Sequence, residues 1–420
     1  MRLAQLALLA CLPMTAADFR AAAAKIDITP QTSQWLMGYD ARKSTGVYDR
    51  IYHRVVAMSA GNQQFYLASS DLCLFSPQVY DEVAQQLERE LGIHRTQFWW
   101  SVTHTHAAPE VGPPGMYKAL LGRSDHEWDR EYAAFAKDTL VRAVKDAKSK
   151  LAPARIAVGQ GMAMANINRR AKDVDGHISL GLNPDGPVDR QVGLIRLDRA
   201  DGSLIALIAN YAMHGTVMNG KNLLISGDGP GTVSAYLEEK LGVPVLYING
   251  AAGNIAPIYT VYPDPKSGHL SELKVLLGDR ILTANHSIGG ATADVTMSMF
   301  ENTISTPRKE GLVWPQELSR YSSETGSPMV RLPVRFLRIN EVLIWAAPIE
   351  LFCEIAITVR NQSTFANTFY FGYTNGWLGY LPTAQAFGEG GYETRTTPFT
   401  PNAEVDITQG VVNFIHGMSR

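Results

Sequence analysis

Apolar and polar residues alternate in three places along the chain in the manner of a β-hairpin. In each place, two runs rich in β-branched and aromatic residues flank a short turn that contains Gly, Asn or Asp. The paired runs are 51–59 with 64–70, 191–198 with 203–211, and 332–339 with 342–347. These segments predict three antiparallel strand pairs.

A helix is predicted directly after the first hairpin. Ser76 is suited to cap its first turn, and Pro77 to occupy its first helical position. Apolar residues then recur every four positions until Gly92 ends the pattern. The apolar run 98–102 follows as a strand, which gives the strand–helix–strand order of an α/β sheet.

Further helical patterns cover residues 128–150, 233–241, 270–284 and 405–418. A short strand is expected at 155–158, and a polar loop at 166–170. We therefore predict the α/β class, with mixed β-sheets flanked by helices in a single large domain. No internal repeat is apparent in the sequence.

Two histidines stand where the strand 98–102 runs out into a Gly- and Pro-rich loop. His104 and His106 are two residues apart, so in an extended chain they point to the same side. The pair suits a divalent metal ion, or one metal ligand beside a catalytic histidine. The alternative is that one histidine ends the strand and the other is an ordinary buried residue. His214 also follows a predicted strand.

The composition is that of a globular protein with enough material for a large core. The chain has 420 residues, of which 45% are hydrophobic and 19% charged, and its formal net charge is -2. Basic residues form no stripe or cluster, so we expect no nucleic-acid partner.

Residues 1–17 resemble a signal peptide, with Arg2 before a short apolar run and Thr15-Ala16-Ala17 as the cleavage site. The run is too short to span a bilayer. A secreted or periplasmic protein is expected, and lipoprotein anchoring through Cys11 is a second interpretation. Cys73 and Cys353 lie in apolar runs and are expected as two buried thiols, although a single bridge between them stays open.

Six motifs, taken in order, carry a family resemblance. They are Lys25-Ile26-Asp27-Ile28-Thr29-Pro30, Thr103-His104-Thr105-His106, Asn210-Tyr211-Ala212-Met213-His214-Gly215-Thr216, Ser226-Gly227-Asp228, Asn249-Gly250-Ala251-Ala252-Gly253, and the run from Asn375 to Thr383. Together they resemble the N-terminal catalytic domain of the neutral/alkaline (non-lysosomal) ceramidases. The resemblance implies that residues 18–420 form one zinc amidase domain, without the immunoglobulin-like C-terminal domain of full-length ceramidases.

The resemblance also implies a ligand set for one Zn²⁺ per chain. The ligands would be His104, His214, Glu350 and Tyr380, while His106 and Arg169 would face the substrate. Two imidazoles and a carboxylate are typical of a catalytic zinc site, where bound water has a pKa of about 7. From their positions after apolar runs, Asp71 and Asp228 are expected to accept hydrogen bonds from the ligand histidines.

Simpler interpretations of single residues stay open at this point. Glu350 alone would suit the first turn of a helix, Tyr380 alone a half-buried aromatic, and Arg169 alone a surface ion pair. The chain also departs from the family, because Ala256 stands where the ceramidases usually have Ser.

The function predicted is zinc-dependent hydrolysis of an N-acyl amide, in ceramide or another lipid amide, by a metal-activated water. An esterase of the same fold and a catalytically silent lipid-binding protein are the alternatives. The expected partner is a small amphipathic lipid amide, with transient contact to a membrane surface. The acyl chain, the head group and the oligomeric state stay open.

Overall fold

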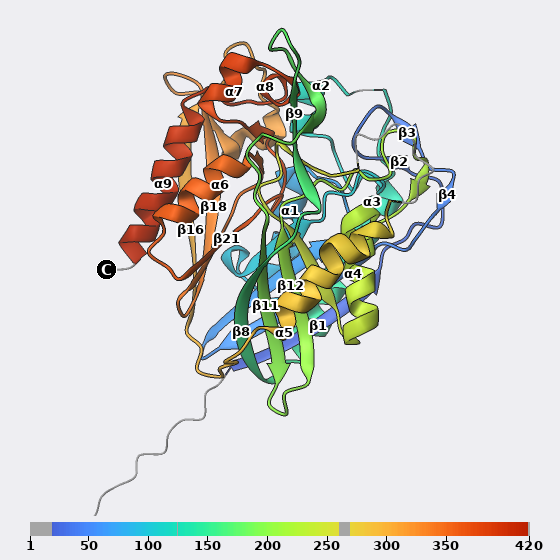
Figure 1. The fold of residues 1–420 in the computed structure, drawn as a ribbon, viewed down its shortest axis with the longest axis vertical. Helices are drawn as coiled ribbons and strands as arrows, with labels where there is room; N and C mark the ends of the chain where they lie inside the picture. Colours follow the sequence, from blue (N-terminus) through green and yellow to red (C-terminus); the bar gives the residue numbers. More distant parts are fainter. Residues whose placement is uncertain (1–18, 124, 260–268, 419–420) are drawn as a thin grey trace, which may run out of the picture.

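The computed structural model describes residues 19–123, 125–259 and 269–418. The signal peptide expected at residues 1–17 lies outside this part of the chain. The predicted α/β class is confirmed, with an eight-stranded mixed sheet, a five-stranded sheet and helices on their outer faces (Figure 1). Most strands belong to one pattern that the chain follows three times.

Repeat 1 covers residues 19–149 and contains a strand, a hairpin, a helix, a fourth strand parallel to the third, and a closing helix. The predicted hairpin and the helix with its Ser76 and Gly92 caps are confirmed. The elements are β1 (Phe19–Asp27), β5 (Tyr52–Ala60), β6 (Gln63–Ser70), α1 (Pro77–Leu91), β7 (Phe98–Val102) and α3 (Arg130–Ser149). Inserted among them are β2 (Trp35–Leu36), β3 (Arg42–Lys43), β4 (Gly46–Val47), a 3₁₀ turn (Arg95–Gln97) and α2 (Met116–Leu121).

Repeat 2 covers residues 152–286 and has the same order. Its elements are β8 (Ala152–Met162), β11 (Gln191–Arg199), β12 (Leu204–Tyr211), α4 (Asp228–Leu241), β14 (Val245–Asn249) and α5 (Asp279–His286), which follows a π-helical turn (Lys274–Gly278). The insertions are β9 (Asn166–Lys172), β10 (Ile178–Asn183), β13 (Leu224–Ile225) and β15 (Ile255–Pro257). The loop predicted at 166–170 is therefore wrong. It is a strand, because β10 and β15 pair with it on either side.

Repeat 3 covers residues 297–418. Its elements are β16 (Met297–Pro307), β18 (Met329–Ile339), β19 (Val342–Ala346), α6 (Cys353–Gln362), β21 (Asn367–Phe371) and α9 (Ala403–Met418). Short elements are inserted here as well: a 3₁₀ turn (Gln316–Tyr321), β17 (Ser322–Ser323), β20 (Glu350–Leu351), β22 (Tyr380–Leu381), α7 (Ala384–Glu389) and α8 (Tyr392–Arg395).

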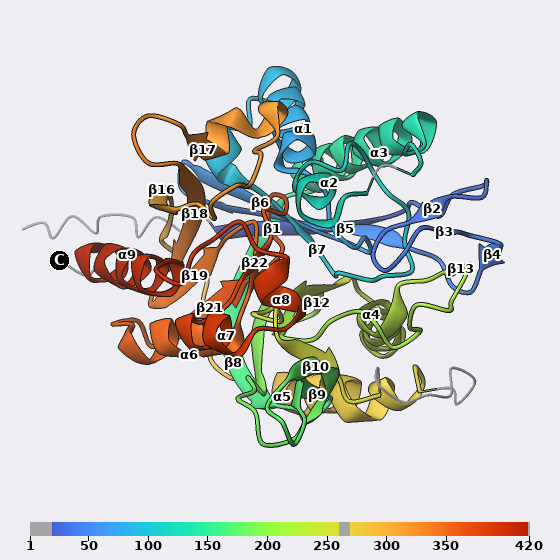
Figure 2. The same ribbon diagram turned by 90° about the horizontal axis from the view of Figure 1, so that it is seen from above.

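The three repeats enclose one central core. β1 pairs with β8, so the sheets of repeats 1 and 2 join into the eight-stranded sheet, and the sheet of repeat 3 packs against it. The shared core takes large side chains from every repeat, including Phe65, Trp99, Ile208, Ile344 and Phe369. Seen from above, the helix pairs α1–α3, α4–α5 and α6–α9 lie outside the strands on three sides (Figure 2).

This repeat was not predicted from the sequence, although all three hairpins were. The repeats agree in strand order and pairing, whereas their first strands read quite differently. β1 is alanine-rich and β16 mixes polar and apolar residues, and alanine is depleted in strands. Among the described residues, no helix is long and apolar enough to cross a membrane.

Candidate active site

The site lies where strands of all three repeats leave their sheets. The third strands β6, β12 and β19 lead within four residues to Cys73, His214 and Glu350. The fourth strands β7, β14 and β21 lead within two residues to His104, Ala251 and Tyr373. Because each third strand is parallel to its fourth, both leave their sheet at the same edge.

Three of the predicted ligands meet at one point. His104 Nε2 lies 3.4 Å and His214 Nε2 3.1 Å from Glu350 Oε2. One ligand atom from each residue lies within 4.8 Å of the other two, and all three side chains are buried. Glu350 does not start a helix, because α6 begins only at Cys353 and Glu350 belongs to the two-residue strand β20.

Each histidine is fixed by a backbone carbonyl at its far nitrogen. His104 Nδ1 donates to the Cys73 carbonyl at 2.9 Å, and His214 Nδ1 donates to the Ile255 carbonyl at 3.0 Å. In a neutral imidazole, a proton on Nδ1 leaves Nε2 with a lone pair, and both Nε2 atoms point towards Glu350. Burial lowers the pKa of His104, but Cys73 and Glu350 raise it to about 10, so without an ion His104 carries a second proton on Nε2 that a metal ion would replace.

Asp71 and Asp228 do not accept from these histidines, so that prediction is wrong. Asp71 pairs with Arg54 at 2.7 Å, and Asp228 accepts the backbone amides of Val217 and Met218, both at 2.9 Å. The Cys73 carbonyl after β6 and the Ile255 carbonyl in β15 lie closer to the imidazole rings. Backbone oxygens therefore accept the hydrogen bonds that the sequence suggested for carboxylates.

Glu350 is held at both oxygens by residues of repeat 3. Trp377 Nε1 donates to Oε1 at 2.8 Å, and the Tyr373 hydroxyl donates to Oε2 at 3.3 Å. Burial alone would raise the pKa of Glu350, but His104 and His214 hold it well below its usual range. The carboxylate is therefore ionised, with Oε2 directed at the two imidazoles.

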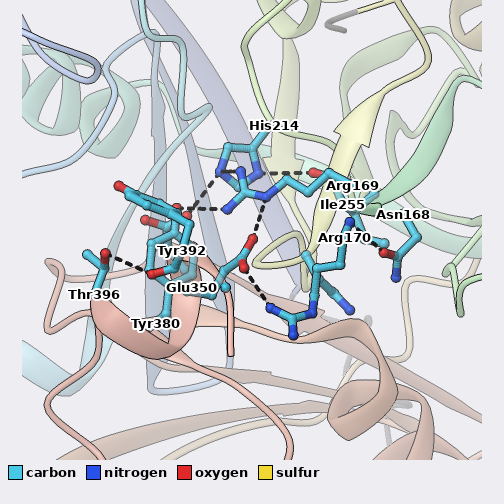
Figure 3. A network of polar contacts seen from close by, with 12 residues as sticks. Asn168, Arg169, Arg170, His214, Ile255, Glu350, Tyr380, Tyr392 and Thr396 are labelled. Carbon is cyan, nitrogen blue, oxygen red and sulfur yellow. Dashed lines mark hydrogen bonds and ion pairs between the residues drawn. The ribbon is translucent and has the colours of Figure 1, made fainter. Parts of the chain in front are cut away.

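Arg169 connects this group to Tyr380. Its guanidinium bonds to His214 Nε2 at 2.9 Å and to the Tyr380 hydroxyl at 3.1 Å, as Figure 3 shows. Its Nε donates to the buried Glu393 at 2.9 Å, and Glu393 also accepts from Arg170 at 2.8 Å. Burial disfavours the charge of Arg169, but Tyr380, Glu393 and Glu350 raise its pKa well above the usual value. Arg169 therefore lies beside the predicted ligands and pairs with a buried carboxylate, in place of the surface ion pair that was its simpler interpretation.

His106 borders the same group from the other side. Its Nε2 lies 3.2 Å from His104 Nε2, and its ring is tilted against that of His214 at 5.9 Å between centroids. Burial and the neighbouring imidazoles lower the pKa of His106 well below its usual value. This histidine is therefore neutral.

The donor set fits a zinc ion. Two imidazoles that bind through Nε2 in their neutral form, together with one carboxylate oxygen, are the ligands of many catalytic zinc sites. Tyr380 would add a phenol oxygen, and burial together with Glu350 raises the pKa of that phenol. Arg169 donates to the Nε2 lone pair of His214. An ion at that nitrogen would use the same lone pair, so this hydrogen bond and the bound ion exclude each other.

A second group, Cys73 with His104 and His106, also has ligand atoms within 4.8 Å of one another. It is the poorer set, because the His104 nitrogen nearest the thiol, 3.7 Å away, already donates to the Cys73 carbonyl. Cys73 and Cys353 are both buried free thiols, which answers the question of a bridge between them.

A cavity of about 540 Å³ opens onto the site. Reactive groups border it together with apolar and aromatic side chains. They include His106, Arg169 and Tyr380, with Tyr39, Tyr117, Leu121, Leu180, Ala256 and Tyr392. The Tyr392 ring packs edge-on against Tyr380 at 5.6 Å.

Five residues of the site were not predicted from the sequence: Tyr39, Tyr373, Trp377, Tyr392 and Glu393. Trp377 stands inside a motif that carried the resemblance, so a signal was present there. Tyr373 and Tyr392 lie in aromatic, glycine-rich stretches whose individual side chains carry no periodic pattern.

The family model "Neutral/alkaline non-lysosomal ceramidase, N-terminal" matches residues 19–256, more than half of the chain. The neutral ceramidase of Pseudomonas aeruginosa is 26% identical over 262 residues, 58% of this chain and 38% of that protein. Neutral ceramidase A of Dictyostelium discoideum is 32% identical over 231 residues, 51% of this chain and 31% of that protein. The matches thus span between about a third and two fifths of these relatives.

The fold likeness extends further than the sequence likeness. The crystal structure of the Pseudomonas aeruginosa neutral ceramidase matches with a TM-score of 0.76 and 20% identity, over 95% of this chain and 74% of that one. Glu350 and Tyr380 lie beyond the residues that the family model matches.

Proposed function

Because the chain belongs to the neutral/alkaline non-lysosomal ceramidase family, we propose that it is a zinc-dependent amidase that cleaves the N-acyl bond of ceramide or a similar lipid amide. One observation carries the proposal. Two imidazole Nε2 atoms and one carboxylate oxygen from three different repeats converge within 4.8 Å, and their neighbours His106, Arg169 and Tyr380 border a cavity that also has apolar and aromatic lining residues. The names of the relatives support ceramide as the substrate.

His104, His214, Glu350 and Tyr380 would hold the ion. A zinc ion in such a site supplies a Lewis acid that activates water and polarises a carbonyl group. The protein supplies the orientation of the ligands through the Cys73 and Ile255 carbonyls and through Trp377.

Arg169 supplies positive charge where the substrate carbonyl gains negative charge. It borders the cavity and is held by Glu393, so it is oriented before substrate arrives. Fixed donors of this kind stabilise a developing oxyanion more than the ground state, and loss of one costs about 10²–10³-fold in rate.

His106 is the group suited to move a proton. It is neutral, borders the cavity and has its Nε2 turned towards the proposed ligands. A neutral imidazole can accept a proton from the attacking water and then, as imidazolium, deliver it to the leaving nitrogen of the amide, which contributes about 10²–10⁴-fold.

The proposal is tested by measuring bound zinc and the turnover of a panel of N-acyl amides and matched esters. About one zinc per chain and faster turnover of the amides are expected. His104→Ala should lose both zinc and activity, whereas His94→Ala, an exposed histidine outside the site, should keep both. Faster ester cleavage would favour the esterase, and tight lipid binding without turnover the silent binding protein. Wild-type protein without zinc would contradict the proposal.

We also propose export to the periplasm or the medium, on the basis of residues 1–17. Transient contact with a membrane would give access to a lipid amide. Expression of the full chain with a C-terminal tag, followed by fractionation and determination of the mature N-terminus, tests the export. A chain that keeps Met1 and stays in the cytoplasm would contradict it.

A further inference from the structure

The segment from Trp35 to Lys43 passes directly over the histidine pair. Its strands β2 and β3 pair with each other, and Leu36 forms a bridge with Pro109 in the loop after His106. Met37 N donates to the Ala108 carbonyl at 3.0 Å. The segment is thus attached to the loop that carries His104 and His106.

Tyr39 is the aromatic residue with which this segment borders the cavity, beside Asp40 and Ala41. Its side chain borders the cavity, its ring lies edge-on to His106 at 4.8 Å, and 37% of the residue is exposed. Its φ is 59°, in the left-handed region that residues with a side chain rarely adopt. A large aromatic side chain in this conformation, turned away from the core, points to a role in the cavity.

Arg42 holds the Tyr39 ring in place. Its guanidinium lies 4.9 Å from the centre of that ring. It donates to the carbonyls of His106 at 2.7 Å, Gly38 at 3.1 Å and Asn222 at 2.7 Å. One buried cation therefore ties together the three segments that surround the ring. Arg42 is a positioning residue and does not border the cavity itself.

Gly38 brings the segment close to His106. A Cβ atom there would lie 2.4 Å from His106 Nδ1, and the φ of 84° is one that residues with a side chain rarely adopt. The backbone before Tyr39 thus rests on the imidazole, so the aromatic ring and the proposed proton carrier keep a fixed relation.

We propose that Tyr39 is a specificity-determining residue, whose ring binds the hydrocarbon chain next to the amide bond that is cleaved. The inference rests on the proposed amidase function and goes beyond it by assigning a chain-binding wall. Leu121 and Leu180 border the same cavity and extend the apolar surface. The chain can belong to the acyl group or to the amine, because either places methylene groups beside the reacting carbonyl.

The test compares wild type with Tyr39→Asn on two series of N-acyl amides. One series lengthens the acyl chain and the other lengthens the amine. Asn tolerates the left-handed conformation, so the substitution removes the ring and spares the backbone. We expect the gain in kcat/KM with chain length to flatten in at least one series. The longest chains should lose roughly tenfold through KM, as expected when about two methylene groups lose a buried contact.

Two further variants make the test specific. Tyr39→Phe keeps the ring and should keep the wild-type gain in kcat/KM with chain length. Phe135→Ala removes an aromatic residue of similar exposure, 41%, on α3, which does not border this cavity, and should also behave as wild type. An unchanged chain-length dependence in Tyr39→Asn, or an equal loss for all substrates, would overturn the inference.

The outcome also separates this inference from the proposed function. If wild type cleaves none of the amides, the amidase function fails. The shift in melting temperature caused by amides of increasing chain length then still tests Tyr39. A shift that grows with chain length in wild type and not in Tyr39→Asn supports the chain-binding wall, and identical shifts contradict it.

Discussion

In repeats 1 and 3 the backbone follows a similar course from the fourth strand into the site, but the side chains at corresponding positions differ. His104 and Tyr373 both stand two residues after the strand, and both are left-handed, with φ values of 64° and 52°. Their rings stack at 4.2 Å between centroids. The His104 ring has a nitrogen placed for the proposed ion, and the Tyr373 ring bonds through its hydroxyl to Glu350. In repeat 2 the corresponding residue is Ala251.

The residues that follow the third strands also differ between the repeats. Repeats 2 and 3 place His214 and Glu350 after these strands, whereas repeat 1 places Cys73 there and uses its carbonyl oxygen. Each repeat thus gives one residue to the cluster of His104, His214 and Glu350, but repeat 1 gives it from its fourth strand, and repeat 3 adds Tyr380 to the proposed ion site. The fold places residues at similar positions in each repeat. The type of side chain at each position determines which of them can bind the proposed ion.

The largest effect is expected when repeat 3 loses its ligand charge. Glu350→Gln should weaken zinc binding by more than about a hundredfold, because even partners outside the ligand set cost about 10–100-fold. Competition with a chelator measures the affinity, and activity should fall with the zinc content. Glu354→Gln, on the neighbouring helix, serves as the control, and equal zinc affinity in the two variants would remove Glu350 from the site.

A smaller effect is expected when the support of that ligand is removed. Trp377→Phe deletes the indole donor 2.8 Å from Glu350 Oε1 and should weaken zinc binding about 10–100-fold. Trp345→Phe, which changes a buried tryptophan outside the site, should lower stability without weakening zinc binding. Similar zinc affinities in both variants would show that Trp377 does not orient the carboxylate.

The contact between repeats 2 and 3 should also be sensitive to size. A Cβ atom at Gly253 would lie 2.6 Å from the Glu350 carbonyl oxygen and 2.9 Å from that of Leu351. Gly253→Ala should lower the free energy of unfolding by about 1–3 kcal/mol and weaken zinc binding as Glu350 is displaced. Gly289→Ala, where a Cβ atom meets nothing within 4 Å, is the matched control. Unfolding in denaturant measures both, and equal stabilities would contradict the close approach.

The last prediction concerns pH and a difference between repeats 1 and 2. His53 is buried, donates to the Ala136 carbonyl at 2.9 Å and contacts Ser70 Oγ at 2.6 Å. Burial lowers its pKa to about 4. The corresponding residue of repeat 2 is Val192. It precedes Gly193, whose partner in the hairpin is Asn210.

The folded protein therefore resists protonation of His53, while the unfolded chain takes up that proton near pH 6.5. The stabilisation due to neutral His53 is complete above pH 6.5 and is lost as the pH falls towards 4, by up to about 3 kcal/mol. His53→Val should remove this part of the pH dependence, measured by denaturant unfolding between pH 7 and 4. Other buried histidines titrate equally in wild type and in His53→Val. The same slope of the unfolding free energy against pH in both proteins would therefore contradict the assignment to His53.

The sequence predicted the local features well and the arrangement in space poorly. Hairpins and the capped helix α1 were predictable because their turns and caps depend on neighbouring residues, such as Ser76 and Gly92. The convergence of His104, His214 and Glu350 was predictable only through the family resemblance. Nothing local in the chain relates residues more than a hundred positions apart.

The partners of the ligands were not predictable from residue type. Asp71 and Asp228 looked suitable, yet backbone carbonyls of Cys73 and Ile255 hold the imidazoles. Any residue has a carbonyl, so the sequence carries no signal for this role. Tyr39 was missed for a similar reason, because its importance comes from the path of the segment over His106.

X-ray absorption at the zinc edge of the purified wild-type protein tests the central claim most directly. The claim is that three repeats converge on one ion held by His104, His214 and Glu350. The spectrum should show about one zinc per chain with nitrogen and oxygen ligands at about 2.0–2.2 Å and no sulfur. A sulfur ligand at about 2.3 Å would place the ion at Cys73 instead, and a protein without zinc would contradict the claim altogether.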